Sequence, residues 1–169
     1  LTGIITDTGG FRYSGVTPET FEFTAELLEK GVNVSDIYKR VLETKTKANF
    51  ELMRRTIDRM EFLEDGKIAF AYLNLEDYEN THAEMGDDEG LVEMLRDIED
   101  VEVAVLLKEK EGANGYKASL RSHETVNVSD ICMLLGGGGH RGAAGCFING
   151  TLDQAKTKII NAVKQGLKK

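Results

Sequence analysis

Apolar and polar positions alternate along this chain with two different periods, which predict both helices and strands. Apolar residues three and four positions apart predict helices over 17–31, 46–63, 89–98, 127–135 and from Thr151 onward. Short apolar or alternating runs predict strands over 3–5, 67–75, 101–108, 116–121 and 146–148. Because helices and strands interleave along the chain, the pattern predicts an α/β fold.

Local sequence signals support several of these element boundaries. Thr17-Pro18 is a typical helix start, with threonine as N-cap and proline at the first helical position. The hexapeptide Val-Asn-Val-Ser-Asp-Ile occurs at 32–37 and again at 126–131. Asparagine at the N-cap with aspartate three positions later opens many helices, so we interpret the two copies as two helix starts. Asn114-Gly115 predicts a hairpin turn.

The helical pattern of 46–63 stops at Asp65-Gly66, where we place a domain boundary. Residues 1–45 then form a first part, 46–65 a connecting helix and 66–169 a second domain. The helix carries an apolar stripe that predicts a packed face: Phe50, Met53, Ile57 and Met60. This face is covered either within the chain or by a partner, so a homodimer remains one of the two alternatives. The predicted core strand at Gly3–Ile5 leads us to expect further chain before Leu1.

Composition narrows the possible functions. The 169 residues are 41% hydrophobic and 30% charged, as in ordinary globular proteins, and the net charge is −8. An acidic chain is poorly suited to broad binding of duplex nucleic acid, which needs many lysine and arginine contacts to phosphates. No apolar run approaches the roughly 20 residues of a membrane span, so we expect a cytoplasmic protein. Cys132 and Cys146 lack metal-ligand spacing and are expected to be buried thiols.

One stretch concentrates the candidate chemistry. Gly136 to Gly139 run directly into His140 and Arg141, and Gly142 and Gly145 follow. Successive glycine N–H groups can form an anion-binding nest, and the histidine and arginine add side-chain donors. We therefore expect a phosphate group at this segment.

Two other interpretations of the glycines need to be weighed. The spacing of Gly137, Gly139 and Gly142 matches the dinucleotide-binding fingerprint, which requires a strand before it and a helix after it. The predicted order here is helix, glycines, strand, so a dinucleotide site is rejected. Alternatively Gly136 caps the preceding helix and the rest forms a tight turn, although a cap needs only one glycine.

Near the start of the chain, Asp7-Thr8-Gly9 admits three interpretations. The triplet occurs in aspartic proteases, but those proteins are nearly all strand and this chain is rich in helical patterns. A turn-forming aspartate is the simplest alternative. The third is a metal ligand, because a carboxylate is a hard oxygen donor suited to Mn²⁺ or Mg²⁺.

Several segments together resemble one known family. The segments 119–122 (SLRS), 127–131 (NVSDI) and 136–145 (GGGGHRGAAG) resemble the DHH-associated substrate domain of the DHH phosphoesterases. Residues 6–12 (TDTGGFR) resemble the last metal-binding motif of the catalytic domain in that family. The resemblance implies a C-terminal remnant of a parallel-sheet catalytic domain, a connecting helix and a smaller mixed-sheet α/β substrate-binding domain.

The resemblance also implies roles for individual residues. It assigns Asp7 as a metal ligand and a further group as substrate contacts to phosphate and ribose: Arg121, Ser122, Gly137, Gly138, Gly139, His140 and Arg141. Members of the family hold two divalent cations, usually Mn²⁺, through an Asp-x-Asp pair and an Asp-His-His triplet. Neither motif occurs in this sequence. We therefore expect this chain to supply the substrate-binding half of a metal-dependent phosphoesterase and to be inactive alone.

The branch that the sequence resembles most hydrolyses short oligoribonucleotides (nanoRNA) and 3′-phosphoadenosine 5′-phosphate. Two alternatives remain from the residues and the resemblance. One is a non-catalytic nucleic-acid-binding module like the C-terminal domain of alanyl-tRNA synthetases, for which a metal-ligand motif at Asp7 has no use. The other is a fragment of a cyclic-dinucleotide phosphodiesterase, a related branch of the family.

Overall fold

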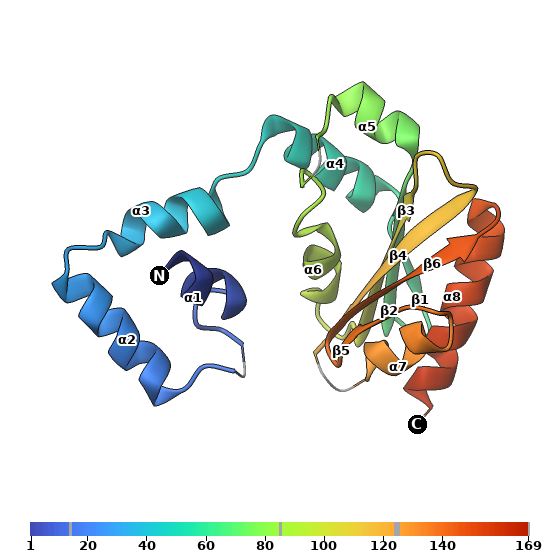
Figure 1. Cartoon of the computed structure of the whole chain (residues 1–169). Coiled ribbons are helices and arrows are strands. Elements are labelled where there is room, and N and C mark those ends of the chain that lie inside the picture. Colours follow the sequence, from blue (N-terminus) through green and yellow to red (C-terminus); the bar gives the residue numbers. More distant parts are fainter. Residues whose placement is uncertain (14, 85, 124–125, 169) are drawn as a thin grey trace. The chain divides into compact units, whose positions relative to one another are not determined.

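The computed structural model describes residues 1–13, 15–84, 86–123 and 126–168 (Figure 1). The chain divides into two compact units, Leu1–Lys45 and Thr46–Lys169. The connecting helix therefore belongs to the second unit. Among the described residues, no helix combines the length and the apolar character needed to cross a membrane.

The first unit is helical throughout its regular structure. It contains α1 (Thr2–Asp7), α2 (Pro18–Glu29), α3 (Val34–Tyr38) and the π-helix η1 (Lys39–Glu43). The strand expected at Gly3–Ile5 is wrong, because these residues lie inside α1. The strand preference of the two isoleucines is weak, and the fold overrides it here. The Thr6 and Thr8 hydroxyls donate to the carbonyls of Gly3 and Ile4, at 3.0 and 2.6 Å.

The helix starts expected in this unit are confirmed. Thr17 is the N-cap of α2, with Pro18 at the first helical position. Asn33 caps α3 by accepting a hydrogen bond from the Asp36 N–H at 3.1 Å. The second copy of the hexapeptide behaves in the same way, because Asn127 accepts from the Ser129 N–H at 3.1 Å. The repeated sequence thus encodes two helix starts.

Helix α4 (Lys47–Asp58) begins where the pattern predicted, with Thr46 as its N-cap, but ends earlier than expected. Residues 61–63 instead form β1 (Glu61–Leu63). The predicted apolar face is half right: Met53 and Met60 pack against the core, whereas Phe50 and Ile57 are 60% and 49% exposed. The face that is buried contains Asn49, Leu52 and Thr56, and its polar members are hydrogen-bonded: Asn49 donates to the Asp87 carbonyl at 2.6 Å, and Thr56 to that of Leu52 at 2.8 Å.

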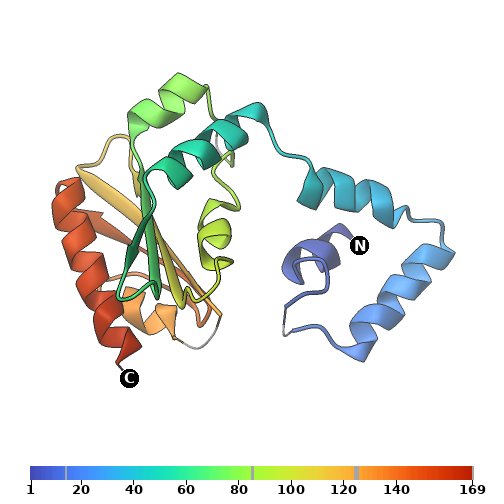
Figure 2. The ribbon, with the colours of Figure 1, turned by 180° about the vertical axis from the view of Figure 1, so that it is seen from behind.

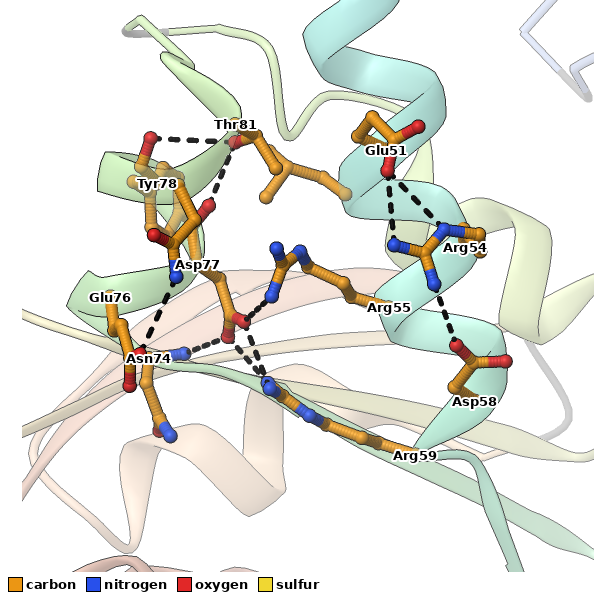
Figure 3. Close-up of polar contacts among 12 residues, drawn as sticks. Glu51, Arg54, Arg55, Asp58, Arg59, Asn74, Glu76, Asp77, Tyr78 and Thr81 are labelled. Carbon is orange, nitrogen blue, oxygen red and sulfur yellow. Dashed lines mark hydrogen bonds and ion pairs between the residues drawn. The ribbon is translucent and has the colours of Figure 1, made fainter.

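A buried carboxylate fixes α4 to the helix α5 (Leu75–Thr81), which the pattern did not predict (Figure 3). The side chain of Asp77 is 2% exposed. Its Oδ1 accepts from Arg55 and Arg59, each at 2.9 Å, and its Oδ2 accepts from the Asn74 N–H at 2.7 Å. Burial raises the pKa of Asp77. The hydrogen bonds from Arg59 and Asn74 and the charge of Arg59 lower it by more, so the pKa lies below its ordinary value.

The second unit is built on a six-stranded mixed sheet in the order β1-β2-β3-β4-β6-β5. β2 (Ile68–Leu73) and β3 (Val103–Glu109) are parallel, and every other neighbouring pair is antiparallel. The expected α/β class with a mixed sheet is confirmed. The last three strands are β4 (Gly115–Ser122), β5 (Gly138–His140) and β6 (Ala143–Asn149).

Helices cover the two faces of this sheet unequally (Figures 1 and 2). On one face α7 (Val128–Met133) and α8 (Leu152–Leu167) pack over β3, β4 and β6 in the larger core. On the other face α4 and α6 (Leu91–Arg96) pack mainly over β2 and β3. The surface of β4, β6 and β5 on this second face carries side chains that are exposed or half-buried, and the candidate site lies there.

Candidate functional site

Helix α7 ends directly in the glycine run. Gly136 has a φ of +79°, in the left-handed region. Its N–H donates to the Met133 carbonyl at 3.1 Å, and the Gly137 N–H donates to that of Cys132 at 2.8 Å. These are the two hydrogen bonds of a Schellman motif, so the interpretation of Gly136 as a helix cap is confirmed. The other glycines need a separate explanation.

The glycines after the cap form the edge strand β5, where the sequence pattern suggested a loop or tight turn. Gly138, Gly139 and His140 pair with Gly145, Ala144 and Ala143 of β6. A Cβ on Gly139 would lie 2.5 Å from the Ala143 carbonyl oxygen, and one on Gly137 would clash with that of Gly145. Close approach of the two backbones therefore accounts for both glycines.

Gly138 differs from its neighbours. A Cβ placed there meets no atom within 4 Å, and the residue has no left-handed φ. Packing inside the described chain thus gives no reason for a glycine at this position. A ligand that lies directly against the strand would give one.

The strand register places the candidate side chains in two cross-strand rows on the less covered face. Arg121, Ala143 and His140 form one row, and Ser119, Gly145 and Gly138 form the next. Directly opposed residues of antiparallel strands project to the same face. The sequence-predicted residues Arg121, Gly138 and His140 are therefore brought together, with small residues between them.

The guanidinium group of Arg121 is held in place by two contacts. Its Nε donates to Oε1 of Glu93, on α6, at 2.8 Å, and its Nη1 donates to the Leu120 carbonyl at 2.9 Å. The side chains of the pair are 25% and 30% exposed. Both terminal nitrogens retain N–H groups that can donate to a phosphate in the paired geometry that arginine favours. Glu93 was not found from the sequence, because it lies 28 residues before its partner.

The remaining predicted contacts do not all lie on this face. Ser122 is 4% exposed, and its hydroxyl donates to the Val126 carbonyl at 2.7 Å, on the side of the larger core. The Gly139 carbonyl accepts from the Ser129 hydroxyl at 2.9 Å. Arg141 is exposed in the β5–β6 turn, and its carbonyl accepts from the Val128 N–H. His123, which follows Ser122 in the chain, has its ring nitrogen 3.2 Å from the Arg96 carbonyl.

Asp7 lies in the first unit as the last residue of α1, not at the end of a strand, and it is exposed. In the described ranges, no three histidine, cysteine, aspartate or glutamate side chains gather into a group that could hold a metal ion. One exposed carboxylate does not make a two-metal cage. The residues present therefore do not fit a complete metal centre.

Cys132 and Cys146 are both buried and reduced, as the sequence predicted. They lie close enough to interact, and a hydrogen bond between them raises the pKa of the Cys132 thiol and lowers that of Cys146. Cys132 lies on α7 and Cys146 on β6, and both belong to the larger core.

Comparisons with known proteins bear on the identity of the second unit. The DHHA1 domain family matches residues 65–169, well over half of the chain. This chain belongs to the DHHA1 domain family. The membership agrees with the resemblance carried by the SLRS, NVSDI and glycine segments, which all lie inside the matched range.

Longer relatives extend the similarity to the first unit. The chain is 38% identical over 168 residues to the bifunctional oligoribonuclease and PAP phosphatase NrnA of Thermus thermophilus, covering 99% of this chain and 49% of the relative. It is 32% identical to the A-adding tRNA nucleotidyltransferase of Aquifex aeolicus, over 95% of this chain and 19% of that protein. A crystal structure of an exopolyphosphatase-related protein from Bacteroides fragilis, 30% identical, superposes with a TM-score of 0.88 over 96% of this chain and 47% of that one. The chain thus spans about half the length of NrnA and less of the nucleotidyltransferase.

Proposed function

We propose that this chain is the substrate-binding half of a cytoplasmic DHH-family phosphoesterase that hydrolyses short oligoribonucleotides, 3′-phosphoadenosine 5′-phosphate or both. In this proposal residues 1–45 are the C-terminal part of the catalytic domain, 46–65 the connecting segment and 66–169 the substrate-binding domain. The 38% identity to NrnA across both units supports it.

The observation that carries the proposal is the open space above Gly138. Gly138 shares its cross-strand row with Gly145 and Ser119, and Arg121 and His140 lie in the adjacent row. A phosphate that settles on the small residues can accept from the terminal nitrogens of Arg121, and the exposed ring of His140 can donate from the other side. The net charge of −8 does not prevent this binding, because the cationic side chains gather locally at the site.

The roles of the other residues follow from their positions. Glu93 positions Arg121, and Arg141 lies exposed in the turn next to His140. Ser122 supports the strand end from the core side. The divalent cations of the family, Mn²⁺ or Mg²⁺, would activate the attacking water. Asp7 offers them a single carboxylate, so we derive no hydrolytic step from this chain.

Isothermal titration calorimetry tests the proposal with three ligands: 5′-phosphorylated diadenylate, 3′-phosphoadenosine 5′-phosphate and a 16-base-pair RNA duplex. We expect the purified chain to bind at least one of the small ligands without added metal and to hydrolyse neither. Arg121→Ala and His140→Ala should each weaken that binding about tenfold or more, the loss typical of a charged hydrogen bond. Binding of the duplex alone would instead support a nucleic-acid-binding module.

A further inference from the structure

The less covered face of the sheet continues beyond the glycine row toward the start of β4. Lys117 lies on this face four residues before Arg121, and the register places Phe147 of β6 directly opposite it. Lys117 is exposed, and Phe147 is 39% exposed. An aromatic ring and a lysine thus stand side by side on the same sheet surface as Arg121 and His140.

Phe147 is held in a defined position. A Cβ added to Gly115 would lie 2.8 Å from Cζ of the Phe147 ring, so the ring reaches across the β4 backbone at this glycine. Gly115 is also the residue diagonal to Phe147 in the ladder, which is the geometry in which a long side chain lies across its neighbouring strand. The ring therefore presents a flat apolar surface next to Lys117.

The charge at this end of β4 is also arranged locally. Lys108 and Lys117 are directly opposed on β3 and β4, a pairing of like charges. Asp88 bonds to Lys108 at 2.7 Å, with both side chains 19% exposed, and accepts from the Tyr78 hydroxyl at 2.8 Å. Burial raises the pKa of Asp88, but Lys108, Tyr78 and Lys117 together lower it below its ordinary value. Asp88 thus balances Lys108, while Lys117 stays exposed beside the ring.

We propose that Phe147 and Lys117 form a second subsite, which binds the third or fourth nucleotide of a single-stranded oligoribonucleotide. The base stacks on Phe147 and a backbone phosphate contacts Lys117. Proteins that bind single-stranded nucleic acids combine an aromatic side chain, on which a base stacks, with cations that contact the backbone phosphates. This inference rests on the proposed function, because the other end of the ligand is the phosphate at Arg121 and His140.

Geometry gives the subsite a length requirement. A strand advances about 3.3 Å per residue, so Lys117 and Arg121 are separated by about 13 Å along β4. A mononucleotide such as 3′-phosphoadenosine 5′-phosphate, held at Arg121, does not reach the ring of Phe147. An oligoribonucleotide of three or four residues does. The surface therefore discriminates in favour of oligoribonucleotides over single nucleotides.

A length series tests this inference. Isothermal titration calorimetry measures binding of 5′-phosphorylated oligoadenylates of one to five nucleotides to the whole chain and to Phe147→Ala, Phe147→Tyr and Lys117→Ala. The matched controls are Phe62→Ala, a 50%-exposed phenylalanine on β1 at the other end of the sheet, and Lys110→Ala, an exposed lysine just after β3. Circular dichroism melts establish that each variant is folded.

We expect affinity to rise at three or four nucleotides by roughly 5-fold to 150-fold, the range that stacking of one base contributes. Phe147→Ala should abolish this rise and leave binding of the dinucleotide unchanged, Phe147→Tyr should restore it, and Lys117→Ala should reduce it. The controls should behave as the original chain. Dinucleotide binding that depends on Arg121, without any effect of Phe147→Ala on longer ligands, overturns the subsite alone. No binding of any oligoadenylate overturns the subsite, and if 3′-phosphoadenosine 5′-phosphate also fails to bind, the proposed function is overturned as well.

Discussion

The Nε of Arg121 donates to the Glu93 carboxylate at 2.8 Å, and Arg121 lies in the same cross-strand row as His140. This contact joins α6 to β4, two elements that meet only in the folded unit. It holds the guanidinium group of the arginine that we propose as a phosphate contact. The arrangement leads to a specific prediction.

Arg121→Lys should not restore phosphate binding. A lysine ammonium is a single point charge, so it cannot bond to Glu93 and also present two parallel N–H groups. We expect affinity for 5′-phosphorylated diadenylate to fall about tenfold, as measured by calorimetry. Arg54→Lys on α4, where the side chain is 59% exposed, is the control and should have no effect. Unchanged affinity in Arg121→Lys would contradict the paired geometry.

Two neighbouring glycines should respond differently to alanine. In Gly138→Ala the new methyl group meets no protein atom within 4 Å, so the melting temperature should hardly change, while ligand binding should be lost. In Gly139→Ala it meets the Ala143 carbonyl oxygen at 2.5 Å at a φ of +150°, and we expect a destabilisation of about 1–3 kcal/mol. Thermal melts and calorimetry separate the two effects. A folded Gly138→Ala chain with full affinity would show that no ligand lies on this strand.

Ser122→Ala should affect stability rather than binding. Its hydroxyl satisfies the Val126 carbonyl at 2.7 Å inside the unit, so the substitution should cost about 1–3 kcal/mol of unfolding free energy. Urea unfolding measures the cost. Below the unfolding transition, affinity for diadenylate should change less than twofold. A large loss of affinity in a variant of unchanged stability would place Ser122 among the ligand contacts instead.

The buried carboxylate of Asp77 should make stability depend on pH below its usual pKa of about 3.8. Because the folded-state pKa is lowered, the stabilisation is present above the unfolded-state pKa and is lost as pH falls through the folded-state value. Asp77→Asn should destabilise the chain by about 3–5 kcal/mol at pH 7, and its stability should fall less steeply at low pH than that of the original chain.

Asp58→Asn provides the matched control for Asp77, since Asp58 pairs with Arg54 on the same helix with 62% of its side chain exposed. It should cost less than about 1 kcal/mol. Urea unfolding between pH 2.5 and 7 compares the variants. Equal losses in both would mean that burial of Asp77 contributes nothing.

Local signals in the sequence predicted much of the fold. The predicted N-caps Thr17, Asn33 and Asn127 all begin helices, because each depends only on residues within one turn. The apolar pair Ile4-Ile5 was misinterpreted because β-branched residues favour strands, a weak preference that the fold overrides here. Half of the expected face of α4 was wrong, because Phe50 is exposed and Asn49 is buried. The carbonyls that accept from the Asn49 amide nitrogen lie 38 and 40 residues away.

The candidate site was predictable in composition but not in arrangement. The glycine run, Arg121 and His140 were visible as a cluster in the sequence. That Arg121 and Ser122 face opposite sides of the sheet follows from strand alternation, which the motif alone does not convey. Glu93 and Phe147 join the site only through helix packing and β4–β6 register, so no local pattern marks them.

The central claim is that the glycine segment and Arg121 bind the phosphate of a small nucleotide ligand. Its most direct test is an NMR titration of the ¹⁵N-labelled chain with 5′-phosphorylated diadenylate, with and without Mn²⁺, alongside Arg121→Ala and His140→Ala. The account predicts metal-independent amide shifts centred on residues 136–145 that disappear in both variants. Shifts that are absent from this segment in a folded chain, or that persist in both variants, would contradict it.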